Sequence, residues 1–220
     1  MIKACIFDLD GTLLNTLFTI SNFANLALEK YGFDSVDPEE VKYMIGNGAK
    51  VLIERMLERV GADVEENIDR VYKYFMKEYN KGVTDGTRPY DGIPELLAEL
   101  STMDIVAAVL SNKPDIAACE SVKLFFGDLI DITHGAREDV PLKPHPEALE
   151  KLLEKIGASA DECIYIGDTA VDMLTGKNGG CFTIGVTWGF RDRDELEENG
   201  ADLIVDSPEE ILEYIKKNKK

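Results

Sequence analysis

The chain has 220 residues, 45% of them hydrophobic, and a formal net charge of −18 at pH 7. The hydrophobic fraction is normal for a globular protein with its own core, and the length fits one large domain or a domain with an insertion. The acidic excess disfavours nucleic acid and anionic membrane surfaces as partners. No apolar run is long enough for a membrane span, and the first residues form a strand-like run rather than a signal peptide.

The cysteines and histidines indicate a reducing compartment and no zinc site. The four cysteines, at positions 5, 119, 163 and 181, are widely spaced. Most of them lie in apolar, strand-like runs, which is typical of buried, reduced thiols in a cytoplasmic protein. The two histidines, at positions 134 and 145, form no cluster with them, so the ligand spacing of a zinc site is absent.

The first 86 residues combine one strand with a helical segment. Residues 4–7 are an apolar run that stops at two acids, which predicts a buried parallel strand followed by a turn. After this run the apolar spacing is helical, with helices expected near 20–31, from 37 onward, near 51–60 and near 68–79. Residues 15–86 carry no strand signal, so they are predicted to be a helical insertion after the first strand.

From residue 89 onward, strand-like and helical patterns alternate. Apolar runs predict further strands at 105–110, 129–133, 163–166, 181–186 and 203–205, and a last helix from 208. Such alternation predicts a parallel sheet with helices on both faces. The expected fold class is therefore α/β: a Rossmann-like core made of residues 1–14 and 87–220, plus an all-helical cap domain made of residues 15–86.

Polar residues suited to one reaction stand near the ends of these strands. They are Asp8 and Asp10, Ser111 and Asn112, Lys143, and Asp168 and Asp172. In a parallel sheet the carboxyl ends of the strands lie along one edge, so residues far apart in sequence converge there. Carboxylates and a lysine around a cleft suit a Mg²⁺ ion and a phosphoryl group, because Mg²⁺ prefers oxygen ligands.

Charge suggests a role for the main groups. Asp8 is the candidate nucleophile that attacks phosphorus, and Asp10 is the candidate acid and base for the leaving oxygen and the water. A phosphate dianion repels a carboxylate, so the attack requires neutralisation. We expect this from Mg²⁺ held by Asp8, Asp168 and the Asp10 carbonyl, together with Lys143.

The other polar residues are expected to bind or orient. Ser111 and backbone N–H groups, including that of Asn112, are placed to bind the phosphoryl oxygens. Thr12 is expected to orient the side chain of Asp10 at the phosphate site. Asp172 is expected to support the metal site through its waters.

These motifs, in this order, resemble the haloacid-dehalogenase-like phosphohydrolases, particularly the phosphoglycolate-phosphatase-like branch with a helical cap. The matching stretches are Asp-x-Asp-Gly-Thr at 8–12, Ser-Asn at 111–112, Lys-Pro-His-Pro at 143–146 and Gly-Asp-Thr-x-x-Asp at 167–172. The resemblance spans nearly the whole chain. Asn15 departs from the pattern, since many relatives carry an acid just after the first motif.

The resemblance implies the same roles that charge suggests. Asp8 is the implied nucleophile, Asp10 the acid and base, and Asp168 a metal ligand with Asp172 as an accessory acid. Ser111 and Lys143 are the implied phosphate ligands. The helical insertion is implied to be a mobile cap that closes over the substrate and excludes bulk water.

The expected function is Mg²⁺-dependent hydrolysis of a small phosphomonoester through an aspartyl-phosphate on Asp8, with 2-phosphoglycolate as the favoured substrate. Pyrophosphate hydrolysis and sugar phosphomutase activity are the alternatives within the family. A non-catalytic phospho-acceptor, similar to a response-regulator receiver, is the alternative from another class; it needs neither Asp10 nor a cap. The expected partner is a small phosphorylated metabolite, and the chain is expected to be a monomer or a homodimer.

The cap is expected to set substrate specificity. Its loop at 46–50 places glycines on both sides of Asn47 and ends at Lys50. Asn47 or Lys50 is a candidate contact for a substrate carboxylate, and a plain turn between helices is the alternative. Cap residues can change without any change in the catalytic motifs, so these motifs do not identify the metabolite.

Overall fold

A six-stranded parallel sheet forms the centre of the molecule, with strand order β5-β4-β1-β6-β7-β8. The computed structural model describes residues 1–218. The sheet strands are β1 (Ala4–Phe7), β4 (Val106–Pro114), β5 (Ile132–Ala136), β6 (Cys163–Gly167), β7 (Phe182–Val186) and β8 (Leu203–Val205). Because β4 and β6 lie on opposite sides of β1, the strand order reverses at β1. Ligands of open α/β sheets bind at such a point.

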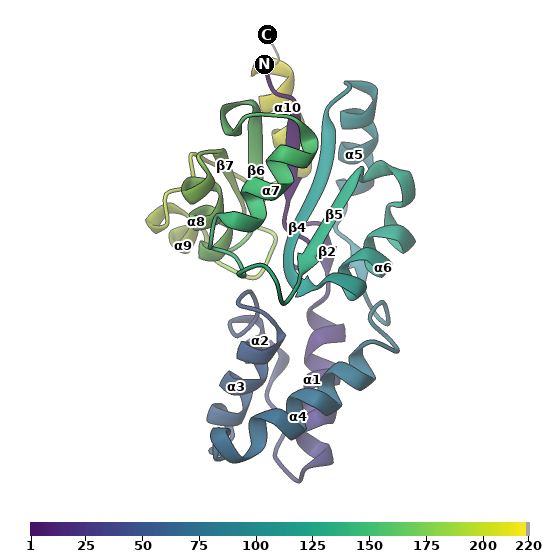
Figure 1. Cartoon of the computed structure of the whole chain (residues 1–220), viewed down its shortest axis with the longest axis vertical. Coiled ribbons are helices and arrows are strands. Elements are labelled where there is room, and N and C mark those ends of the chain that lie inside the picture. The colour runs from purple at the N-terminus through teal and green to yellow at the C-terminus, as the bar shows by residue number, and fades with distance from the viewer. Residues whose placement is uncertain (219–220) are drawn as a thin grey trace.

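The helices of the sheet part cover both of its faces (Figure 1). They are α5 (Ile93–Thr102), α6 (Asp115–Phe125), α7 (Glu147–Ile156), α8 (Ala170–Gly179), α9 (Arg193–Glu198) and α10 (Pro208–Asn218). Alternate residues of β1 point to opposite faces. Phe7 packs in the cluster with α5 and α10, and Ile6 packs in the cluster with α7. The predicted α/β class, with helices on both faces of a parallel sheet, is confirmed.

Four further helices lie beyond the carboxyl ends of the strands (Figure 1). They are α1 (Leu17–Lys30), α2 (Pro38–Lys42), α3 (Ala49–Arg59) and α4 (Val64–Tyr79). Their buried apolar stripes form a separate hydrophobic cluster, which also takes in Phe190 and Ala117 from the sheet part. We call these helices and their loops the cap; its exact division from the core at 14/15 and 86/87 stays a prediction.

A two-stranded antiparallel ribbon joins the two chain segments that connect core and cap. It pairs β2 (Leu14–Asn15) with β3 (Arg88–Pro89). Two-residue strands are too short to show a period of two, so the sequence carried no signal for them. The other strand expectations are close. The main shift is β5, which begins at Ile132, because residues 127–129 form a 3₁₀ turn instead.

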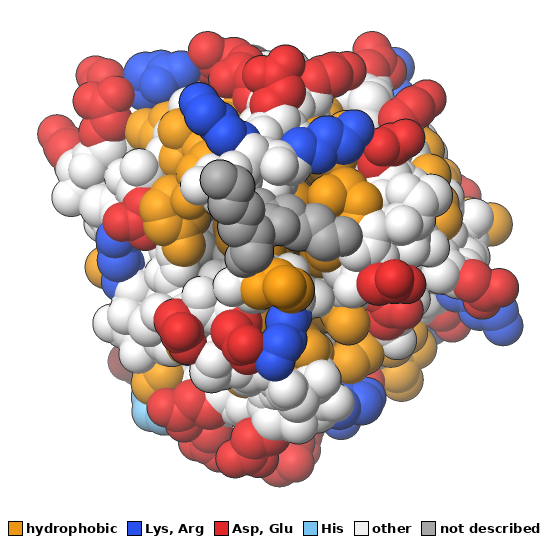
Figure 2. All heavy atoms as spheres, turned by 90° about the horizontal axis from the view of Figure 1, so that it is seen from above, with side chains coloured by type: hydrophobic (Ala, Val, Ile, Leu, Met, Phe, Trp, Pro, Cys, Tyr) orange, Lys and Arg blue, Asp and Glu red, His pale blue; other side chains and the backbone are white. Residues whose placement is uncertain are grey.

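Acidic side chains are prominent at one end of the core. Figure 2 shows the end of the core that carries the two termini and lies opposite the cap; acidic side chains stand around its rim with lysines and arginines between them. Among the described residues, none of the helices has the length and apolar character needed to cross a membrane.

Candidate active site

The turn after β1 brings Asp8 and Asp10 to the edge of the sheet. Gly11 has a φ of +90°, which favours glycine, and a Cβ atom there would lie 2.2 Å from an Asp168 carboxylate oxygen. The chain then turns back, and the N–H groups of residues 13 and 14 both donate to the Leu9 carbonyl at 3.1 and 2.9 Å. The glycine therefore allows this turn to pack directly against the end of β6.

Three buried carboxylates meet at this edge. Asp8, Asp168 and Asp172 each offer an oxygen atom, and these atoms all lie within 4.8 Å of one another. Asp168 and Asp172 are fully buried, and Asp8 is 7% exposed. Such a cluster of buried carboxylate oxygens fits a divalent cation, because buried charges need a counter-charge.

Lys143 partly neutralises this cluster. Its Nζ lies 3.0 Å from Asp8 Oδ1 and 2.8 Å from Asp172 Oδ1, and it donates to the Tyr165 hydroxyl at 3.1 Å. Burial tends to lower the pKa of Lys143, but the carboxylates of Asp172 and Asp8 raise it well above its usual value. Three carboxylates and one ammonium leave two negative charges, which a divalent ion would balance.

Burial in this cluster raises the pKa values of two of the acids, Asp8 and Asp168. Burial raises the pKa of Asp8 to about 6; Lys143 opposes this shift, while Asp172 and Asp10 add to it. Burial, followed by repulsion from Asp172 and Asp8, also raises the pKa of Asp168 well above its usual value. Both shifts come from like charges confined away from water.

Asp168 is held from two sides. Thr12 Oγ1 donates to Asp168 Oδ1 at 2.8 Å, and the Phe190 N–H donates to Asp168 Oδ2 at 2.8 Å. Trp188 Nε1 donates to the Thr12 carbonyl at 3.0 Å and so braces the same turn. The sequence analysis expected Thr12 to orient Asp10, whereas the structure places its hydroxyl on Asp168, whose carboxylate it helps to fix.

Asp172 is fixed by the start of α8. It occupies the third helical position after Thr169, and its Oδ2 accepts from the Thr169 N–H at 3.1 Å and from the Thr169 hydroxyl at 2.7 Å. This is a capping box with Asp in the place of Glu. The other carboxylate oxygen remains directed at Lys143. Helix capping and site formation therefore use the same side chain.

Ser111 and Asn112 lie within the last part of β4, which continues to Pro114 and does not end at residue 110 as predicted. Asn112 Nδ2 donates to the Lys143 carbonyl at 3.1 Å, and Asn112 Oδ1 accepts from the Lys143 N–H at 2.9 Å. This pair of bonds fixes the backbone of Lys143 beside the last residues of β4. Asn112 Nδ2 also donates to the Gly46 carbonyl of the cap at 3.0 Å. Ser111 Oγ accepts from the Lys113 N–H at 3.3 Å.

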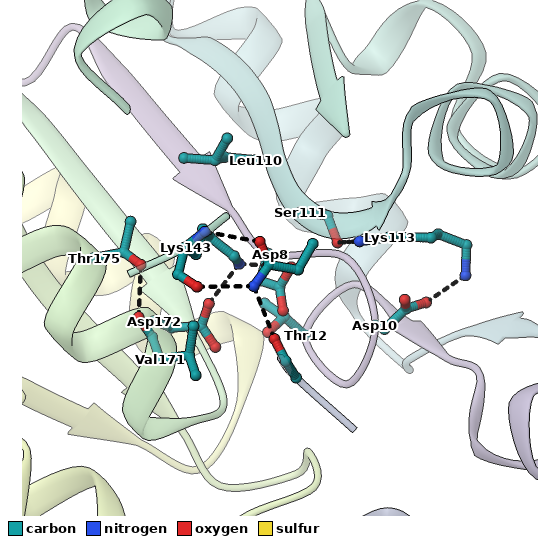
Figure 3. Close-up of polar contacts among 12 residues, drawn as sticks. Asp8, Asp10, Thr12, Leu110, Ser111, Lys113, Lys143, Val171, Asp172 and Thr175 are labelled. Atoms are coloured by element: carbon teal, nitrogen blue, oxygen red, sulfur yellow. Dashed lines mark hydrogen bonds and ion pairs between the residues drawn. The ribbon is translucent and has the colours of Figure 1, made fainter. Parts of the chain in front are cut away.

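Asp10 points away from the acidic cluster, as Figure 3 shows. Its Oδ1 accepts a hydrogen bond from Lys113 Nζ at 2.8 Å. Lys113 Nζ also donates to the Tyr79 hydroxyl at the end of α4. Burial raises the pKa of Tyr79 to about 12, although Lys113 opposes that shift. Asp10 and Lys113 therefore form a second polar group that reaches the cap.

A cavity that is open to solvent lies between core and cap. The core lines it mainly with polar residues: Asp8, Asp10, Ser111, Asn112, Lys113, Pro114, Thr169 and Phe190. The cap lines it mainly with apolar residues: Ile20, Ile45, Gly46, Gly48, Ala49, Leu52, Phe75 and Tyr79. The cavity thus has a reactive wall and an apolar wall.

The two candidate substrate contacts in the cap, Asn47 and Lys50, contact other cap residues in the structure. Asn47 Oδ1 accepts from Arg55 Nη2 at 2.9 Å, and Asn47 is not among the lining residues, although both of its glycine neighbours are. Lys50 Nζ lies 3.7 Å from the exposed carboxylate of Asp69. The structure therefore brings the other predicted site residues together, but it gives Asn47 and Lys50 partners within the cap.

Two residues with polar side chains at the cavity were not singled out from the sequence. Lys113 directly follows the Ser-Asn motif, but the apolar run ends at residue 110, and the sequence did not show that β4 continues to Pro114 and carries Lys113 to the cavity. Tyr79 had no detectable signal, because its position on a helix stripe is equally typical of a residue in the cap core.

The sheet edge, the acidic cluster and the helical insertion together define a capped α/β phosphatase. Residues 5–186 match the model of the haloacid dehalogenase-like hydrolases, and the chain belongs to this family. The resemblance stated from the motifs is therefore confirmed.

Curated relatives and solved structures agree with this assignment. The chain is 31% identical over 223 aligned positions to phosphoglycolate phosphatase from Vibrio parahaemolyticus, with 97% of this chain and 96% of that protein covered. It is 30% identical over 220 positions to phosphoglycolate phosphatase from Pectobacterium atrosepticum, with 97% and 92% covered. A crystal structure from Lactobacillus delbrueckii subsp. bulgaricus, provisionally named as a phosphoglycolate phosphatase, superposes with a TM-score of 0.91 at 30% identity, covering 97% of this chain and 98% of that one.

Proposed function

We propose that this phosphatase hydrolyses a small phosphomonoester, with 2-phosphoglycolate as the favoured substrate, and that Mg²⁺ is its metal. The observation that carries the proposal is the meeting of Asp8, Asp168 and Asp172 within 4.8 Å, with Lys143 between two of them. The relatives named as phosphoglycolate phosphatases over almost their full length support the choice of substrate.

The donor set fits Mg²⁺. Asp8 and Asp168 would hold the ion directly, with the Asp10 carbonyl as a further oxygen ligand and Asp172 beside them. Mg²⁺ takes hard oxygen ligands and keeps several waters, so few carboxylates suffice. When bound, the ion supplies positive charge that offsets repulsion between the phosphate and the acids.

Asp8 is the nucleophile in this proposal. A carboxylate oxygen of Asp8 attacks phosphorus, the bond from phosphorus to the ester oxygen breaks, and Asp10 gives a proton to the leaving oxygen. Asp10 then takes a proton from water as the water oxygen attacks the aspartyl-phosphate. The bond between Asp8 and phosphorus breaks, and inorganic phosphate and the free carboxylate result.

Further groups of the core are proposed to bind the phosphoryl oxygens during this reaction. Lys143 is proposed to contact the phosphoryl oxygens, and its buried ammonium already faces Asp8 at 3.0 Å. Ser111 Oγ and the Asn112 backbone N–H are proposed to bind further phosphoryl oxygens. Thr12 contributes by fixing Asp168 beside the phosphate site.

The helical insertion, residues 15–86, is proposed to act as a lid over the cavity. Its apolar wall excludes water from the reacting groups. Asn47 is kept as a proposed substrate contact through its amide N–H₂ group, since its oxygen accepts from Arg55. A small phosphorylated metabolite is the proposed partner; cytoplasmic location and a monomeric or homodimeric state stay predictions.

Phosphate release tests the proposal. The assay uses the purified chain in the presence of MgCl₂, because Mg²⁺ takes hard oxygen ligands such as the carboxylates of this site. We expect phosphate release from 2-phosphoglycolate, loss of activity with EDTA and recovery on adding Mg²⁺. A phosphorylated protein that does not turn over would instead support the receiver-like alternative.

A further inference from the structure

Lys113 is a buried lysine at the cavity that the proposed catalytic steps do not use. Its side chain is 1% exposed, yet it belongs to the cavity lining. Its Nζ donates to Asp10 Oδ1 at 2.8 Å and to the Tyr79 hydroxyl. A lysine ammonium carries three N–H donors, so one donor remains after these two bonds. A buried ammonium with a remaining donor beside a cavity is well placed to bind an anion.

The charge on the cavity wall makes this position distinctive. Among the described residues that line the cavity, Lys113 is the one lysine or arginine, while Asp8 and Asp10 are acidic and most of the cap wall is apolar. The whole chain carries a net charge of −18. An anionic group that enters this part of the cavity meets repulsion from the chain unless a local cation offsets it.

Lys113 and Lys143 lie on different sides of Asp8. Figure 3 shows Lys143 and Asp172 on one side, and the pair of Asp10 and Lys113 on the other. Lys143 therefore serves the phosphoryl end of a bound ester. Since Asp10 acts on the ester oxygen, its partner Lys113 stands at the leaving-group end.

We propose that Lys113 determines substrate specificity by binding a carboxylate on the leaving group of the phosphoester. This inference rests on the proposed function. Because Lys113 Nζ is 2.8 Å from the oxygen of Asp10 that serves the ester, the carboxylate must lie within one or two carbon atoms of the ester oxygen. The substrate class is then the phosphate esters of 2-hydroxycarboxylic acids.

Two substrates that differ at this end test the proposal. 2-Phosphoglycolate carries a carboxylate where ethyl phosphate carries a methyl group, and the readout is the ratio of their kcat/KM values. For the unaltered enzyme we expect a ratio of about 100, because ethyl phosphate lacks the charge-assisted hydrogen bond that the carboxylate of 2-phosphoglycolate accepts from Lys113. A ratio near one overturns the role of Lys113 without any variant being made.

The variant Lys113→Met tests whether Lys113 is the residue that causes the preference for 2-phosphoglycolate. We expect the ratio to fall by about 100-fold, because 2-phosphoglycolate loses its cation and ethyl phosphate does not. If Lys113 only positions Asp10, both substrates lose activity equally and the ratio stays unchanged, which overturns the proposal. Lys113→Arg keeps the charge and should retain a ratio well above that of Lys113→Met. If Lys113→Met fails to fold, an Arg variant without preference overturns the proposal in its place.

The control variant is Lys151→Met, which removes a half-exposed lysine on α7 that pairs with Glu147. We expect it to leave the ratio unchanged. Hydrolysis of ethyl phosphate and p-nitrophenyl phosphate reports separately on the proposed function. If the unaltered enzyme hydrolyses no ester, the proposed phosphatase function fails. If it hydrolyses the esters without preference, phosphomonoester hydrolysis stands, and the role of Lys113 fails together with the choice of 2-phosphoglycolate.

Discussion

The core wall and the cap wall of the cavity are built from different kinds of group. On the core wall, side chains from separate strand ends fix one another: Thr12 bonds Asp168, and Lys143 bridges Asp8 and Asp172. On the cap side, the core holds the loop before α3 largely through backbone carbonyls. The bonded carbonyls are those of Lys42, Tyr43, Ile45 and Gly46.

This difference has a consequence for what each wall determines. The core wall needs particular side chains, so its chemistry is tied to short sequence motifs. A backbone carbonyl is present in any residue, so the contacts that hold the cap loop constrain its sequence very little. The cap can therefore change its lining, and with it the substrate, while the reaction stays the same.

Asp8→Asn gives the largest expected effect and tests the core wall. The amide is a poor nucleophile, so we expect phosphate release to fall by about 10⁴-fold or more, as for other nucleophile replacements. The measurement is phosphate release from 2-phosphoglycolate with Mg²⁺. Asp69→Asn on the exposed face of α4 is the matched control and should keep full activity. Activity in Asp8→Asn close to that of the control would remove Asp8 from the mechanism.

Lys143→Met should have the next largest effect. It leaves Asp8 and Asp172 buried without their ammonium. We expect kcat to fall by about 10²- to 10³-fold and the free energy of unfolding by about 3 kcal/mol. Mg²⁺ should restore part of this stability by occupying the acidic cluster. A melting temperature that falls equally with and without Mg²⁺ would contradict the charge balance described for this site.

Much of this core wall was predictable from the sequence, because most of the strands contain an apolar run and most of the motifs directly follow one. The partners of the side chains were not. Thr12 and Asp168 are 156 positions apart, and only the packing of the turn against β6 brings them together. The contact of Lys113 with Tyr79 depends equally on how α4 docks. Local patterns determine the elements, whereas such contacts depend on the packed tertiary structure.

Mg²⁺ binding is expected to weaken as pH falls. The pKa of Asp8 is about 6 in the folded protein, above the ordinary value of 3.8. Mg²⁺ requires the ionised carboxylate, so we expect about tenfold weaker binding at pH 5 than at pH 7 in calorimetric titrations. Asp168, whose pKa is also raised, adds to the effect in the same direction.

Without metal, the stability of the folded protein changes with pH in the opposite direction to Mg²⁺ affinity: it falls as pH rises. A raised pKa means that the folded state holds the proton more tightly than the unfolded state. Asp8 therefore lowers the stability of the metal-free protein as pH rises from about 4 to about 6. Saturating Mg²⁺ should reverse this trend. Asp8→Asn is the control, and its Mg²⁺ affinity should depend less on pH; an unchanged dependence would assign the effect to other groups.

Arg191→Ala is expected to have the smallest effect, and it tests the cap side. The Arg191 guanidinium donates to the carbonyls of Lys42, Tyr43 and Ile45 at 2.8, 3.0 and 2.9 Å. Its loss removes core contacts from the loop that carries Ile45 and Gly46 to the cavity. We expect KM to rise about fivefold, which corresponds to about 1 kcal/mol of substrate binding, while kcat changes less.

Arg193→Ala is the control for this prediction, because Arg193 lies two positions away and pairs with Asp206 within the core. It should leave KM unchanged. If Arg191→Ala instead lowers kcat as strongly as Lys143→Met does, the cap loop takes part in positioning the reacting groups. The two walls then act as one unit, and the separation of chemistry from substrate choice does not hold for this enzyme.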